Sequence, residues 1–95
     1  MYKTDYEAVA ASQSDQVLGP SGNKGDTLET LVVSVATAAT GTVSIKDGSG
    51  SAITITAANT PIGVYSVKVG ARSQSGGWKV TTGAGATVLA VGRFT

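Results

Sequence analysis

The sequence contains no cysteine and no histidine. Without cysteine, the chain can form neither a disulfide framework nor a thiolate metal site. It also lacks the commonest general base and the strongest nucleophile of enzyme active sites. Serine is plentiful, but no serine lies in a recognisable motif with an activating partner. We therefore predict that the chain is not an enzyme, and we expect no catalytic residue, no cofactor and no metal site.

Large side chains and charged side chains are both scarce. Aromatic residues make up 5% of the 95 residues and charged residues 14%, whereas apolar residues, mostly Val, Ala and Ile, make up 41%. A chain of this length forms one domain with a modest core. A thin core combined with so little charge indicates that a neighbouring subunit or a partner protein covers part of the apolar surface. We therefore expect a homo-oligomer.

Acidic residues are missing from the second half of the chain. All six lie at or before Asp47, and only Lys68, Arg72, Lys79 and Arg93 follow it. The net charge is +1, and the cations are not clustered, so we predict no nucleic-acid binding. If the fold separates the two halves, head-to-tail or ring-like association is one use for the asymmetry. Scattered surface charge for solubility is the simpler explanation.

Long hydrophobic segments are absent as well. The longest apolar run, residues 31–39, is too short and too rich in Ser and Thr to cross a bilayer. Residues 1–7 are polar and contain no apolar segment of the kind found in signal peptides. We therefore predict neither membrane insertion nor a signal peptide.

The pattern that is present is a two-residue alternation of apolar and polar side chains, which is typical of strands with one buried face. Gly-rich and Ser-rich turns separate the alternating runs at spacings of roughly 8–12 residues. Strands are predicted at residues 6–10, 31–36, 42–46, 53–56, 65–69, 78–81 and 88–92. In the last of them both sets of alternating residues are small or apolar, which predicts cover on both faces.

Seven or eight short strands of this kind predict an all-β fold. We expect a single small β-sandwich, jelly-roll or Greek-key-like, formed by residues 6–95. Residues 1–5 are predicted to be an N-terminal arm, since they are polar and precede the first alternating run.

The aromatic residues divide into two groups. Trp78 alternates with Val80 and is predicted to fill the core, although an exposed Trp could instead stack on a sugar ring. The same reasoning applies to Tyr65, whose hydroxyl is expected to reach the surface. Tyr2 and Tyr6, in contrast, lie in a polar terminal segment with little core to join. We interpret both as possible partner contacts, buried against a neighbouring subunit.

Two loops contain residue types that occur in ligand sites. In the Gly-rich loop at residues 19–26, Asn23 precedes Lys24 and Gly25 follows it, so the phosphate-binding loop pattern is not met. The loop at residues 47–51 offers only one carboxylate, Asp47, whereas a calcium site usually collects more. We expect Asp47 to close a hairpin by an Asx-turn.

Several stretches in a defined order resemble a group of small proteins encoded among the virion structural genes of tailed bacteriophages. These stretches are residues 6–13, 16–19, 25–29, 31–33, 43–48, 77–83 and 91–95. None of them is a catalytic motif, and the resemblance carries no site residues across. It implies a β-sandwich located in the virion and assembled in the cytoplasm of the bacterial host.

The resemblance leaves several roles open. The role that it favours is capsid decoration (cement), in which the protein binds the major capsid protein or other virion proteins and stabilises the head shell. A homo-oligomer is then expected, with a trimer favoured because it suits quasi-threefold positions on a capsid. The alternative is a β-module of a head fibre, the neck or the tail. In that role the module could bind glycans on the host surface.

Overall fold

The computed structural model describes residues 5–19, 21–38 and 40–94. Within these residues the chain forms eight strands and no helix, and the strands make two antiparallel sheets of four. The strands are β1 (Asp5–Val9), β2 (Gln16–Val17), β3 (Thr27–Val35), β4 (Val43–Asp47), β5 (Ile53–Thr56), β6 (Gly63–Arg72), β7 (Trp78–Thr81) and β8 (Ala86–Arg93).

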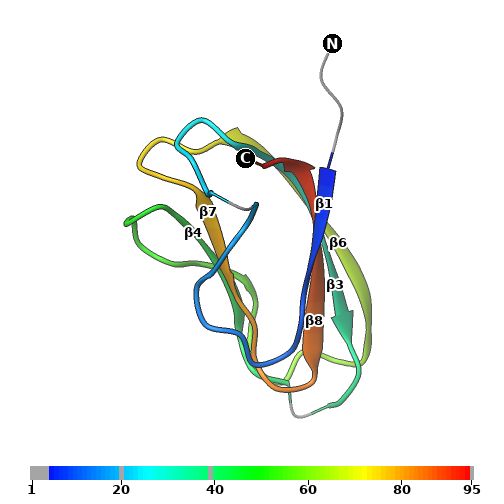
Figure 1. Ribbon diagram of the computed structural model, residues 1–95. Coiled ribbons are helices and arrows are strands. Elements are labelled where there is room, and N and C mark those ends of the chain that lie inside the picture. The colour runs from blue at the N-terminus through cyan, green and yellow to red at the C-terminus, as the bar shows by residue number, and fades with distance from the viewer. Residues whose placement is uncertain (1–4, 20, 39, 95) are drawn as a thin grey trace.

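The strand order is that of a jelly roll. One sheet, here called sheet A, has the order β1-β8-β3-β6, and the other, sheet B, has the order β2-β7-β4-β5. The antiparallel pairs β1–β8, β2–β7, β3–β6 and β4–β5 are those obtained by folding the chain back on itself at β4–β5. The folded ribbon then wraps into two facing layers, which Figure 1 shows edge-on. The predicted β-sandwich is confirmed, and its topology is resolved.

The core lies between the two sheets and is built by the inward side chains of the alternating runs. Strand β3, for example, buries Leu28, Leu31, Val33 and Val35, and the residues between them stay half-buried on its other face. The remaining buried apolar residues are Val9, Leu18, Val43, Ile45, Trp78, Val80, Ala86, Val88, Ala90 and Phe94. The two-residue alternation therefore predicts correctly which face of most strands is buried.

Trp78 is part of this core, as its alternation with Val80 predicts. Only 4% of its surface is exposed, and its indole Nε1–H donates a hydrogen bond of 3.1 Å to the carbonyl of Asp26. The indole is thus buried with its polar group satisfied, which is how a buried Trp is normally accommodated.

The loops gather in two groups, one at each end of the sandwich, and each group is held by close backbone contacts between glycines. At one end Gly41 lies against Gly83: a Cβ built on Gly83 would stand 2.3 Å from the Gly41 Cα atom. At the other end Gly22 lies against Gly77, where an added Cβ would stand 2.4 Å from the Gly22 Cα atom. Such distances exclude any side chain, so the glycine content of these loops serves packing.

Several strand limits differ from those predicted. Asp5, which the sequence analysis placed in the arm, pairs with Gly92 as the first residue of β1, and the rest of the predicted arm lies outside the described residues. The two-residue strand β2 was not among the predicted ranges. Strand β8 has buried residues on its inner face only: Thr87, Leu89 and Arg93 are exposed on the outer face of sheet A. Its predicted cover on both faces is therefore wrong for the chain by itself.

Candidate interaction surfaces

Acidic side chains in this molecule hold loops in place. The Glu7 carboxylate, on β1, accepts hydrogen bonds from Gln16 Nε2 at 2.9 Å and from the Gly19 backbone N–H at 2.7 Å. Because Gln16 belongs to β2, this contact joins the adjacent edges of the two sheets. The Asp26 carboxylate is buried in the loop before β3 and accepts a bond of 3.3 Å from the Asn23 backbone N–H.

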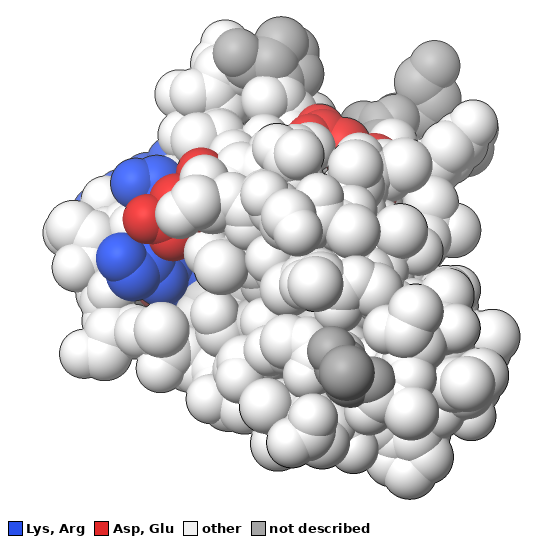
Figure 2. All heavy atoms as spheres, turned by 90° about the horizontal axis from the view of Figure 1, so that it is seen from below, with Lys and Arg blue, Asp and Glu red and all other residues white. Residues whose placement is uncertain are grey.

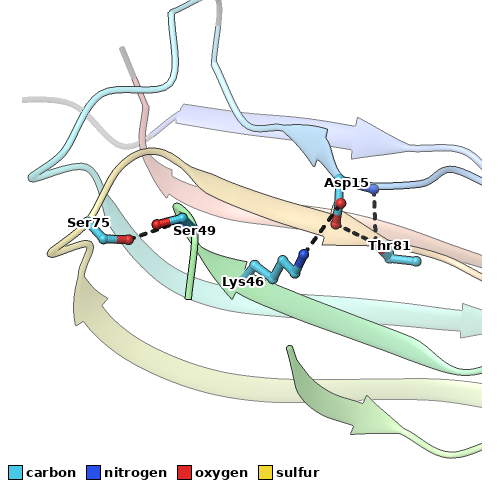
Figure 3. Close-up of polar contacts among 5 residues, drawn as sticks. All are labelled: Asp15, Lys46, Ser49, Ser75 and Thr81. Atoms are coloured by element: carbon cyan, nitrogen blue, oxygen red, sulfur yellow. Dashed lines mark hydrogen bonds and ion pairs between the residues drawn. The ribbon is translucent and has the colours of Figure 1, made fainter. Parts of the chain in front are cut away.

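Asp47 acts differently from the Asx-turn residue that we expected. Its carboxylate accepts the backbone N–H of Gln74 at 2.9 and 3.0 Å, and that of Ser75 at 3.1 Å. The hairpin itself is closed by the Gly50 N–H, which donates to the Asp47 carbonyl. The Ser49 N–H donates to Ser75 Oγ (Figure 3). Asp47 therefore connects the β4–β5 and β6–β7 loops, and the expected Asx-turn is wrong.

The outer face of sheet B is polar and partly charged. Lys46 on β4 lies directly opposite Lys79 on β7, an arrangement that repels unless an anion is near. Asp15 supplies that anion: its carboxylate lies 3.6 Å from Lys46 Nζ and accepts a hydrogen bond of 3.1 Å from Thr81 Oγ1 (Figure 3). In Figure 2 such basic and acidic atoms lie side by side at one side of an otherwise mostly uncharged view.

The outer face of sheet A is apolar over three neighbouring strands. The register places Leu89 of β8 between Ala8 of β1 and Val32 of β3, and Val91 of β8 opposite Tyr6. These five residues, which we call the sheet A patch, thus occupy adjacent positions on one sheet face. Tyr6 and Ala8 are exposed, as is Leu89 at 37%, while Val32 and Val91 are half-buried. Large exposed apolar patches mark interaction sites, and the sheet A patch is therefore a candidate for one.

The two predicted partner contacts have different outcomes. Tyr6 is 73% exposed and lies at the β1 edge of the sheet A patch, where its ring has no place in the core of its own chain. Tyr2 lies outside the described residues. Tyr6 is therefore positioned as a partner contact would be, and the role itself stays a prediction.

One end of the sheet A patch is basic. Thr27 on β3 lies opposite Arg72 on β6 and opposite Arg93 on β8. Lys68 follows on the same face, opposite Thr30. All three basic side chains are exposed. The excess of cations in the second half of the sequence therefore becomes a basic border to an apolar surface.

The β5 and β6 edges of the two sheets form a second apolar region. The inward residues of β6 (Tyr65, Val67, Val69 and Ala71) pack against the core but remain only partly buried, as does Ile55 on β5. On the same side of the molecule Ile53, Ile62 and Val64 are exposed. Alternation alone could not reveal this region, because it does not show which strands lie at an edge.

Neither a metal-ligand cluster nor a membrane-spanning helix is present in the part of the chain that the structure describes. Within it, no group of three or more acidic side chains is placed to hold a metal ion, and it contains no helix long and apolar enough to cross a membrane. Comparison of the chain with family models, with curated proteins and with solved structures yields no match.

Proposed function

We propose that this chain is a structural protein of a tailed-bacteriophage virion, and that it decorates the head shell by binding the major capsid protein through the sheet A patch. The observation that carries the proposal is the apolar outer face of sheet A, with Leu89 exposed between Ala8 and Val32. A surface of this kind on a small, rigid sandwich is suited to lasting contact with another protein.

The resemblance described above and the jelly-roll topology both support this role. Jelly rolls are common in viral capsid proteins, although they also occur in lectins and cupins. Because a fold does not determine a function, the case for this role depends on the chemistry of the molecular surface. The surface offers apolar contact area and a basic border, while the acids with the clearest contacts, Glu7, Asp15 and Asp47, are engaged within the chain.

The sheet A patch supplies a limited amount of binding energy per copy. Complete burial of one fully exposed large apolar side chain contributes about 1.5–3 kcal/mol. Tyr6 is 73% exposed, but Leu89 is 37% exposed and Val91 is half-buried, so these two contribute only part of that amount. Association consumes several kcal/mol in lost rigid-body freedom. A single copy therefore binds modestly, and lasting attachment is expected when neighbouring copies also contact each other.

Trp78, the strongest candidate for binding a glycan, is not accessible to a ligand. Its indole, which would have to stack on a sugar ring, is buried in the core. Tyr65 is half-buried, and its hydroxyl donates a hydrogen bond of 2.6 Å to the Pro61 carbonyl. Head-fibre, neck and tail positions use the same kind of apolar surface, and they differ from a shell position in copy number.

The proposal is tested by adding purified protein to shells of the source virus that lack it, and measuring the amount that sediments with them. We expect Leu89→Lys to reduce binding at least tenfold, because it places a charge at the centre of the apolar contact. Thr54→Lys is the matched control, since Thr54 is exposed on the outer face of sheet B and should bind normally. Wild-type protein that never sediments with shells would refute the decoration role.

A further inference from the structure

The longest of the described strands lies at the edge of a sheet. Strand β6 has 10 residues, whereas the other edge strands, β1, β2 and β5, have 5, 2 and 4. Natural proteins usually keep edge strands short or protect them with charges, prolines or bulges, because a free edge pairs with other chains. Between Gly63 and Val69, β6 has a single charged residue, Lys68, and no proline. Its one irregularity falls between Lys68 and Ala71, where the register against β3 shifts and Gly70 has a φ of 61°, so the free edge proposed below is the part of the strand before Gly70.

The side chains along this edge are covered on one side only. Tyr65, Val67 and Val69 point between the sheets, yet all three remain half-buried. Strand β5, the neighbouring edge of sheet B, has only 4 residues. At the opposite edge, Glu7 on β1 and Gln16 on β2 join the two sheets by a side-chain hydrogen bond. The sandwich is therefore closed at one edge and apolar at the other.

We propose that two copies of this chain associate through β6, which pairs with itself in antiparallel orientation about a two-fold axis at Val67. The two sheets A then form one continuous sheet across the dimer, and each copy covers the apolar edge of the other. This inference does not rest on the decoration role or on the sheet A patch, because it concerns a different edge of the molecule.

The sequence of β6 fits such self-pairing. A two-fold axis at Val67 places Tyr65 opposite Val69 of the second copy on the inner face, an aromatic–β-branched pair of the kind that stabilises sheets. On the outer face it places Ser66 opposite Lys68. Inward residues of one copy therefore lie opposite inward residues of the other, and outward residues opposite outward residues, as any antiparallel pairing requires.

Charge disfavours two of the other registers. An axis at Lys68 would place Lys68 directly opposite itself, and an axis at Gly70 would place it opposite Arg72, so both registers repel. The axis at Val67 keeps these cations apart and centres the pairing on Tyr65–Val69, ahead of Gly70, which has a φ of 61° and lies where the register of β6 against β3 shifts.

The start of β6 is fixed before any partner arrives. The Tyr65 hydroxyl donates to the Pro61 carbonyl, and the Asn59 N–H donates to the Thr40 carbonyl at 2.7 Å. These bonds anchor the β5–β6 loop and the first residues of β6. Less conformational entropy is then lost on pairing, which favours association.

The consequence is a dimer, or a larger assembly built from dimers, in place of the trimer that the resemblance favours. Two-fold interfaces are the commonest kind in homo-oligomers because the same surface serves both partners. In the particle such a dimer would link two copies bound at neighbouring sites.

Substitutions at Ser66 test the pairing. Ser66 is exposed on the outer face of sheet A, so a change there leaves the core intact. With the axis at Val67, Ser66→Lys creates two repulsive pairs with Lys68, and we expect the dimer dissociation constant to rise about tenfold. Ser66→Glu creates two attractive pairs instead, and we expect tighter dimers whose gain decreases with added salt.

The measurement is sedimentation velocity of the purified full chain over a range of concentrations, with far-UV circular dichroism to verify the fold. Thr87→Lys is the control: Thr87 is exposed on the same sheet face but belongs to the central strand β8, and the dimer should be unaffected. Opposite effects of the two Ser66 variants would establish the pairing. A wild-type monomer at high concentration, a trimer, or equal effects of both variants would overturn it.

Discussion

At the residue scale, side-chain hydroxyl groups and carboxylates join the loops of this molecule. Thr82 Oγ1 donates to the Ala10 carbonyl at 2.6 Å and accepts a bond of 2.9 Å from the Gln13 N–H, which joins the β1–β2 loop to the β7–β8 loop. Asp47 does the same for two loops at the other end. Because each contact joins residues far apart in the sequence, the loops stabilise the sandwich as well as connecting its strands.

We expect Gly83→Ala to destabilise the fold by about 1–3 kcal/mol, because the added methyl group would overlap the backbone of Gly41. In a domain of this size, each kcal/mol lowers the melting temperature by roughly 4–8 °C. Thermal unfolding followed by circular dichroism measures the change. Ala84→Ser, at the exposed neighbouring position, serves as the control, and equal melting temperatures for the two variants would show that the glycine contact is dispensable.

At the element scale, alternation predicted most strands and their buried faces, but it did not predict their neighbours. The pattern around Val43 and Ile45 identifies β4 as half-buried whichever strands flank it. Strand β2, with two residues, is too short to show a period. The apolar outer residues of β8 led to the prediction that both faces of this strand are buried. Within the chain they form the sheet A patch instead, because only the arrangement of strands decides whether a second layer lies there.

The edge position of β6 leads to a prediction for hydrogen exchange. If β6 pairs with a second copy, its backbone N–H groups that point away from β3 are protected in the dimer and exchange rapidly in the Ser66→Lys variant. The N–H groups of β3 and β8, which lie inside sheet A, should exchange alike in both proteins. Exchange in β6 that is equally rapid in wild-type protein and variant would contradict the pairing.

At the scale of the whole molecule, the fold class followed from composition and period, and the topology did not. Sandwiches of different strand order share the same alternation, so the jelly-roll order was open until the strands were placed. The candidate surfaces were only partly predictable: Tyr6 was identified because a polar terminus has little core to bury it, whereas Leu89 and Val64 became candidates only through their exposure. A chain of 95 residues with a modest core would gain stability from the subunit contacts that we propose.

The decoration role is tested most directly by the number of copies in purified particles of the source virus, determined by quantitative mass spectrometry relative to the major capsid protein. We predict a copy number comparable to that of the capsid protein, because a protein that stabilises the shell must cover it. A few copies per particle would contradict shell decoration and assign the chain to a vertex, the neck or the tail. Complete absence from the particle would contradict the virion role itself.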